Sequence, residues 1–246
     1  MCTLIVGWNA LGPGTMLVAA NRDEDPARPA EGPRVLRATP RIVGGRDARA
    51  GGTWLAIRER RLLVAVLNRR DPEPAPADAR RPSRGLLALS VAAAGNGRPD
   101  HAARAARLLL GADAYAPCSL VIAGPEGAWL AVRDRGAPPR VGPLAPGWHA
   151  LTHAELDDPN EPRAAWLVRQ LAGFAPRSVD EALERLGGWL AVHGGPGPAV
   201  CLHDGRMVTV STSRVWLTRE AARYLHGEGP ACRATLEDHS HLLHPE

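Results

Sequence analysis

A cysteine stands at position 2, directly after the initiating methionine. Methionine is removed when the second side chain is small, so we expect Cys2 to become the amino-terminal residue, with a thiol and a free α-amine. Typical pKa values are about 7.7–8.0 for such an amine and about 8.5 for a thiol, so the amine can accept the thiol proton near neutral pH. One residue would then supply nucleophile and base. Taken alone, Met-Cys more often merely starts a strand.

A cluster of polar residues, Asn21-Arg22-Asp23-Glu24, follows an apolar segment. Arg22 would lower the pKa of a nearby thiol, and Asp23 or Glu24 would hold the α-amine or the arginine. A hairpin between the first two strands would bring this cluster close to Cys2 if the register is suitable. The alternative is a solvated turn.

Two further segments carry residues suited to catalysis. Gly51-Gly52-Thr53-Trp54 combines paired glycines, which permit a tight turn and close backbone approach, with a large aromatic ring. Asn68 follows an apolar run and could donate an amide N–H to a developing oxyanion. The alternative for Asn68 is an ordinary turn residue.

Blocks of strands and helices must position these residues. Their segregated order indicates an α+β fold with largely antiparallel sheets, in one domain spanning residues 1–246. Residues 23–50 and 71–82 are predicted to be loops, and the histidine-containing tail to be loosely held. A capping box, Ser178 with Glu181, predicts one helix start. The predicted strands are 3–8, 16–20, 53–57, 62–67, 119–123, 128–132, 199–202, 207–210 and 215–217, and the predicted helices 84–94, 100–110, 163–171 and 179–190.

The composition excludes several classes of function. All basic residues are arginine, and they are dispersed without interleaved aromatics, which argues against nucleic-acid binding despite a net charge of +4. No run approaches the roughly 18–20 apolar residues of a membrane helix, and no secretory signal is present, so we expect a cytoplasmic protein. Cys118 and Cys201 are predicted to be buried core residues, while Cys232 is uninformative. Histidine spacing suggests no metal site, so no cofactor or metal is expected.

Four segments in order, Met1-Cys2-Thr3, Ala20–Glu24, Gly51–Leu55 and Leu67-Asn68, closely resemble the NRDE family, which is also called transport-and-Golgi-organisation-2-like. The match is dense over roughly the first 70 residues. That family is in turn similar to the cysteine N-terminal-nucleophile (Ntn) hydrolases. The resemblance implies a four-layer αββα sandwich, attack on an amide carbonyl, an acyl-enzyme, and hydrolysis by water.

The resemblance also implies roles for particular residues. The catalytic set would be Cys2, Arg22, Asp23 and Asn68, and the substrate-binding set Asn21, Glu24, Trp54 and His153. Three features depart from the family pattern. The order of the Asn21–Glu24 segment differs from an Arg-Asn-x-Asp segment, His153 replaces an asparagine, and Val210 stands where arginine is common, with Arg206 or Arg214 as candidate replacements.

The leading hypothesis is therefore a hydrolase that cleaves a small-molecule amide or acyl derivative through an acyl-enzyme on Cys2. The first alternative is a non-catalytic carrier or trafficking protein on the same fold, handling lipid, acyl groups or haem. A cysteine protease with a Cys-His pair is a third and weaker alternative, because Cys2 lacks the surrounding signature and no histidine lies in a recognisable motif. The sequence does not specify the substrate or the oligomeric state.

Overall fold

Two antiparallel sheets form the centre of the protein in the computed structural model, which describes residues 2–71, 81–195 and 197–244. In these residues, the first sheet has the strand order β10 (Gly147–Leu151), β1 (Thr3–Trp8), β2 (Met16–Glu24), β11 (Val208–Leu217), β12 (Ala222–Glu228), β13 (Glu237–Asp238). The second has the order β3 (Ala30–Arg37), β4 (Ile42–Asp47), β5 (Leu55–Arg58), β6 (Leu62–Asn68), β7 (Cys118–Gly124), β8 (Gly127–Arg133), β9 (Arg140–Pro143).

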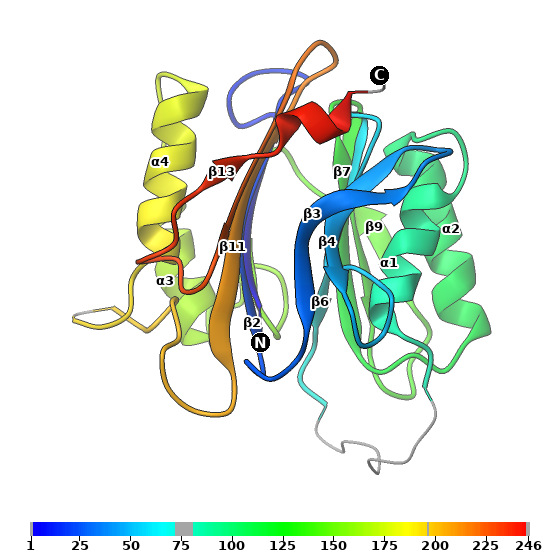
Figure 1. Ribbon diagram of the computed structural model, residues 1–246, viewed down its shortest axis with the longest axis horizontal. Coiled ribbons are helices and arrows are strands. Elements are labelled where there is room, and N and C mark those ends of the chain that lie inside the picture. The colour runs from blue at the N-terminus through cyan, green and yellow to red at the C-terminus, as the bar shows by residue number, and fades with distance from the viewer. Residues whose placement is uncertain (1, 72–80, 196, 245–246) are drawn as a thin grey trace.

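The sheets pack face to face, with a helix pair on each outer face (Figure 1). Leu4 and Val18 of the first sheet share a buried core with Ile57 and Leu63 of the second. Outside the second sheet lie α1 (Arg84–Ala93) and α2 (Pro99–Ala112), and outside the first lie α3 (Pro162–Leu171) and α4 (Val179–Leu190). The predicted αββα layering is therefore confirmed.

The predicted helices correspond to α1–α4 within two residues at each end. Ser178 caps α4, since its hydroxyl accepts the Glu181 amide at 3.1 Å. The first two strands form the expected antiparallel hairpin, in which Thr3 faces Asn21. This hairpin makes β1 part of the first sheet, so that Cys2, directly before it, packs against the core between the sheets, near the N label in Figure 1.

The prediction of a loop over residues 23–50 was wrong, because β3, β4 and the end of β2 lie there. Sequence reasoning missed β4 because two of its buried residues are glycines. A Cβ on Gly44 would lie 2.1 Å from the Leu55 carbonyl oxygen, and one on Gly45 would lie 2.2 Å from the Trp54 ring. These glycines therefore permit close packing within the strand and do not mark a turn.

Other predicted boundaries also need correction. Residues 199–202 form no strand, and the tail is ordered: it contains β13 and a 3₁₀ turn at Ser240–Leu243, with Leu243 buried in the core. Strands β9, β10 and β12 were not predicted. Most of the predicted loop at 71–82 lies outside the described residues. Among the described helices, none has the length and apolar character needed to cross a bilayer.

Candidate active site around Cys2

Cys2 lies directly before β1, half-buried against the core between the sheets. Because Thr3 pairs with Asn21, Cys2 lies opposite Arg22 on the neighbouring strand. The Arg22 guanidinium stacks on the Trp54 ring, 4.3 Å from its centroid, and so links the first sheet to the segment that enters β5. The hairpin register thus brings Cys2, Arg22 and Trp54 together.

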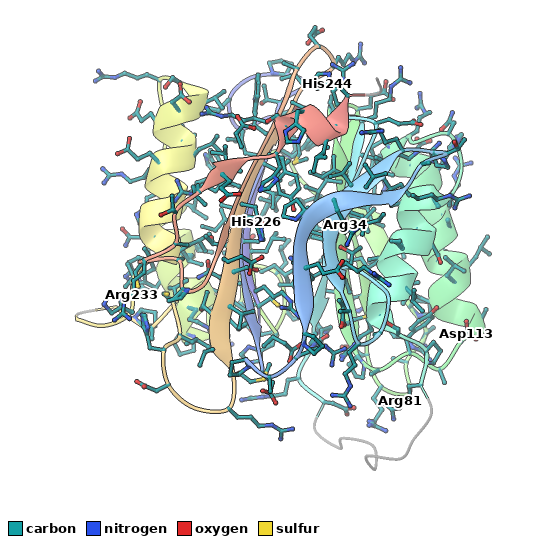
Figure 2. The ribbon with its side chains drawn as sticks, viewed as in Figure 1. Arg34, Arg81, Asp113, His226, Arg233 and His244 are labelled. Atoms are coloured by element: carbon teal, nitrogen blue, oxygen red, sulfur yellow. The ribbon has the colours of Figure 1, made fainter. Side chains whose placement is uncertain are left out.

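Two connected hollows meet at Cys2. The inner one is a narrow, mainly apolar hollow of about 20 Å³, with Leu4, Ala65 and Leu67 in its walls. The outer one, of about 340 Å³, is a polar cleft that includes Asp23, Glu24 and Asn68, and it is also lined by Arg81, which is labelled at the lower edge of Figure 2. The residues that border both are Cys2, Arg22, Trp54 and Val66.

The two faces of β2 separate the predicted polar cluster. Arg22 points toward Trp54, whereas Asn21 donates its amide to the carbonyl oxygens of Leu190 at 2.9 Å and Val200 at 3.2 Å. Asn21 therefore joins β2 to the end of α4 and the loop beyond it. Alternation along a strand explains this division, because successive side chains point to opposite faces.

Asp23 is fully buried and lies in a network that fixes its carboxylate. The Thr209 hydroxyl donates to it at 2.7 Å, and the Arg163 guanidinium lies 3.4 Å away. Arg163 also donates to the Thr3 hydroxyl at 3.2 Å, and its other terminal nitrogen lies 3.2 Å from the His153 ring. His153 thus lies beside Arg163 and outside the residues that line the two hollows.

Burial dominates the titration of this site. It raises the pKa of the Cys2 thiol, which the Asp23 charge raises further and the Arg22 charge lowers. Burial also raises the pKa of Asp23 from 3.8 to about 6, against the opposing effects of Thr209 and Arg163. For His153, burial and then the Arg163 charge lower the pKa, so the ring is neutral at pH 7.

The polar cleft gathers arginines with different partners. Arg28 is paired with Asp47 at 2.6 Å, and Glu24 lies 3.9 Å from Arg28. Arg84 donates to the Pro117 carbonyl oxygen at 3.1 Å, and burial lowers its pKa. Within the described ranges, neither Arg22 nor Arg84 has a carboxylate within 4 Å, so both could receive an anionic group.

The departure at Val210 has a structural explanation. A bulge separates the pairs Thr209–Asp23 and Ser211–Arg22, and Val210 lies in it without a partner on β2. Arg214 does not replace the absent charge at Cys2, since its guanidinium packs against Gly187 of α4. Arg206 lies by a separate hollow next to Glu24. The buried cation beside Asp23 is instead Arg163 of α3.

Sequence reasoning missed Arg163, Thr209 and a relay from Ser213. An arginine at the start of a helix resembles a solvated residue in the sequence. The helix start itself could have been predicted, because Glu161 before Pro162 is an N-cap of α3.

The Ser213 hydroxyl, on the wall of the apolar hollow, lies 2.9 Å from Nδ1 of His226, whose Nε2 lies 3.2 Å from Glu228. The pairing of β11 with β12 creates this relay, so the sequence holds no short signal for it.

Comparison with known proteins identifies the family. Residues 1–193 of the 246 match the family described as Transport and Golgi organisation 2. The chain belongs to that family. The resemblance seen in the four sequence segments is therefore confirmed. No curated protein sequence matches the chain.

Solved structures of two hydrolases share the fold of this family member. An N-acylethanolamine-hydrolyzing acid amidase ortholog from Caenorhabditis elegans matches with a TM-score of 0.59 and 16% identity, over 87% of this chain and 92% of that one. A conjugated bile acid hydrolase variant from Clostridium perfringens matches with a TM-score of 0.53 and 9% identity, over 100% of this chain and 95% of that one. At these identities the likeness establishes an Ntn-hydrolase-like fold.

Proposed function

We propose that this protein is an Ntn hydrolase that cleaves a small N-acyl amide, with Cys2 as nucleophile after removal of Met1. The observation that carries the proposal is the position of Cys2, at the junction of an apolar hollow and an arginine-bearing polar cleft. Such a junction can place the two halves of an acyl amide on either side of the thiol. The polar cleft, at about 340 Å³, is in the range of small-molecule sites, roughly 300–1,000 Å³, whereas the apolar hollow, at about 20 Å³, has to open to admit an acyl group.

The first half-reaction forms a thioester. The α-amine of Cys2 accepts the thiol proton, and the sulfur attacks the carbonyl carbon of the amide. The carbonyl oxygen becomes an oxyanion, toward which Asn68 of the cleft donates its amide N–H. The C–N bond then breaks, the leaving nitrogen takes the proton from the ammonium group, and the acyl group remains on sulfur.

The second half-reaction releases the acid. Water enters from the polar cleft and gives a proton to the α-amine as its oxygen attacks the thioester carbonyl. The C–S bond breaks, the sulfur recovers the proton, and the carboxylic acid leaves. One amide and one water thus yield one acid and one amine.

Buried charges prepare the amine and the thiol for these steps. The Asp23 carboxylate, held by Thr209 and Arg163, stabilises the ammonium form of the Cys2 amine. Arg22 opposes the effect of burial on the thiol pKa and is itself held by Trp54. In this assignment Asn21 holds β2 in place, His153 holds Arg163 in place, and Glu24 borders the substrate cleft.

The two hollows also indicate the chemical class of the substrate. The apolar walls of the inner hollow, which include Leu4, Ala65 and Leu67, suit an apolar acyl portion, for which the hollow of about 20 Å³ has to widen. A polar or anionic amine portion fits the cleft, where Arg22 and Arg84 lack carboxylate partners among the described residues. The proposal keeps the expected cytoplasmic location, in which thiols remain reduced.

A second candidate is a non-catalytic carrier on the same fold. The observation that favours it is the raised pKa of Cys2, which keeps the thiol protonated at neutral pH and weakens it as a nucleophile. In a carrier, the apolar hollow would hold a ligand, and Cys2 would be part of its wall.

Three measurements on the same preparations separate these candidates. Intact mass should show loss of Met1, and a panel of N-acyl amides with apolar acyl groups and anionic amine portions should be hydrolysed. An electrophilic acyl probe should label the wild type at Cys2 but leave Cys2→Ala unlabelled, with Cys118→Ala as the control. Retained Met1, or turnover that persists in Cys2→Ala, contradicts the hydrolase. Ligand binding without turnover or labelling favours the carrier.

A further inference from the structure

Four metal-ligating side chains meet on loops away from Cys2. His193 follows α4, Cys201 and His203 precede β11, and Cys232 lies between β12 and β13. Figure 2 places Arg233, the neighbour of Cys232, beside the loop that follows α4. Residues that lie 2 to 39 positions apart in the chain are thus brought together.

The distances among Cys201, His203 and Cys232 approach those of one tetrahedral metal site. The sulfurs of Cys201 and Cys232 are 3.9 Å apart, and Nε2 of His203 lies 3.2 Å from the Cys232 sulfur and 3.8 Å from the Cys201 sulfur. His193 joins this group through His203 and Cys232, since ligand atoms of these three residues all lie within 4.8 Å of one another, a set that does not include Cys201. Tetrahedral zinc with bonds of about 2.3 Å to sulfur and about 2.0 Å to nitrogen separates its ligands by about 3.3–3.8 Å.

The orientation of His193 fits the role of a ligand. Its Nδ1 lies 3.0 Å from the Ala191 carbonyl oxygen, so this nitrogen carries the proton and donates it. Nε2 is then left with a free lone pair for a metal. A backbone carbonyl that fixes the tautomer of a ligating histidine is a common supporting contact in metal sites.

Cys201 and Cys232 are both free thiols. Cys201 is buried, Cys232 and His203 are half-buried and His193 is exposed, so a bound ion would be shielded from solvent on the side of the cysteines. Neither thiol borders the hollows at Cys2.

We propose that His193, Cys201, His203 and Cys232 form a structural zinc site. Two thiolates and two imidazoles are a ligand set that zinc prefers, and four protein ligands leave no open position for substrate. Binding releases the protons of both thiols, so affinity rises with pH. The spacing of these residues along the chain matches no finger or ribbon motif, and for this reason the sequence suggested no metal.

The site would hold together three loops that carry little regular structure. It would also support the Cys2 site through a short chain of hydrogen bonds. Leu202, between two of the ligands, donates its amide to the Thr209 hydroxyl at 2.9 Å and accepts the Thr209 amide at 2.9 Å. The same hydroxyl donates to Asp23. Zinc thus acts here as a positioning group for Thr209 and has no contact with substrate.

Metal analysis of the purified full-length protein tests the proposal. Elemental analysis after growth with zinc should give about one zinc per chain, because one closed set of four ligands holds one ion. Cobalt(II) added to the chelated protein should give the absorption of tetrahedral cobalt with thiolate ligands. Cys232→Ser and His203→Asn should each lower zinc affinity by more than the roughly 10–100-fold typical of losing an outer contact. His241→Asn and Cys118→Ala, which remove the same residue types elsewhere, should bind zinc as the wild type does.

Three results would overturn the proposal. The first is wild-type protein that holds no zinc after purification and gives no thiolate–cobalt spectrum when reconstituted. The second is a mass lower by two hydrogens that shows Cys201 and Cys232 joined as a disulfide under cytoplasm-like reducing conditions. The third is unchanged metal content in Cys232→Ser. The wild-type measurements decide the matter even if a variant fails to fold, and they are independent of any hydrolase activity.

Discussion

Cys2 and Cys201 are thiols placed by different means. Cys2 lies at the start of a strand, with a partner strand on one side and the opposing sheet on the other, so its surroundings are fixed by hydrogen-bond register. Cys201 lies on a loop and meets Cys232 from another loop. Most of the first region falls within residues 1–193 that match the family, whereas three of the four ligands in the second lie beyond them.

The two regions differ in what stabilises them. The fold itself surrounds Cys2 with compensated charges, since Arg163 offsets Asp23 and Trp54 holds Arg22. The loops around Cys201 lie outside the strands, although the Cys201 amide donates to the Val192 carbonyl oxygen at 2.8 Å, and an ion would add a cross-link between them. A thiol held by strands can therefore serve chemistry, while thiols held by loops are better suited to binding a metal.

Removing the Cys2 sulfur should have the largest effect. Cys2→Ala is expected to lower kcat/KM for the best acyl amide by at least about 1,000-fold, because no second nucleophile completes the thioester. Its thermal midpoint should stay close to that of the wild type. Cys118→Ala, on the opposite face of the second sheet, is the matched control and should retain activity. Equal losses in both variants would contradict the assignment of Cys2.

Removing Arg163 should damage both stability and activity. Arg163→Met leaves the Asp23 carboxylate buried without its cation, which typically costs about 3–5 kcal/mol in the free energy of unfolding. The cost should be smaller at pH 5, where Asp23 becomes protonated, than at pH 8. Denaturant unfolding at both pH values measures this. Arg169→Met on the exposed side of the same helix is the control and should change little.

The α+β class and the order of strands and helices could be predicted from the sequence for physical reasons, whereas the four layers followed from the family resemblance. Continuous apolar runs such as Leu62–Leu67 identify buried strands, and Ser178 with Glu181 identifies a helix start. The sequence did not reveal β4, because Gly44 and Gly45 lack the side chains on which periodicity depends. Arg163 was missed because tertiary contacts alone distinguish it from a solvated arginine. The ligands around Cys201 were missed because loops of unrelated length bring them together.

The pH profile tests whether burial sets the chemistry at Cys2. The pKa of Asp23 is raised to about 6, so the carboxylate that holds the amine is lost as pH falls through 6, and kcat/KM should then drop about tenfold per unit. The contribution of Asp23 to the free energy of unfolding depends on pH in the opposite direction. It is fully present below pH 3.8, where the carboxyl is protonated, and is lost as pH rises through 6. Asp23→Asn should remove this acid limb and lower activity at pH 8, whereas Asp25→Asn should keep the limb. A wild-type profile flat from pH 5 to 7 would contradict the role of Asp23.

Chelation tests whether the two regions are coupled. Removing zinc should loosen the Leu202–Thr209 contact and raise the activation free energy of hydrolysis by about 1 kcal/mol. Hydrolase activity should then fall roughly fivefold, and added zinc should restore it. The metal-free protein should also unfold at a lower denaturant concentration. Cys232→Ser should show no further loss on chelation. Full activity in chelated wild type that has lost its zinc would mean that the two regions act independently.

The contact between Arg22 and Trp54 should give the smallest effect. Trp54→Phe keeps an apolar ring beneath the guanidinium but weakens the cation–π attraction by about 0.5–1 kcal/mol, so KM should rise roughly two- to fivefold. Because the smaller ring leaves Arg22 less well held, its effect on the Cys2 thiol should also weaken, and the pKa seen in thiol labelling should rise. Trp129→Phe, on the helix-covered face of the second sheet, changes the same residue type away from the site. A rise in KM without a change in labelling would mean that Trp54 contacts substrate directly and does not act through Arg22.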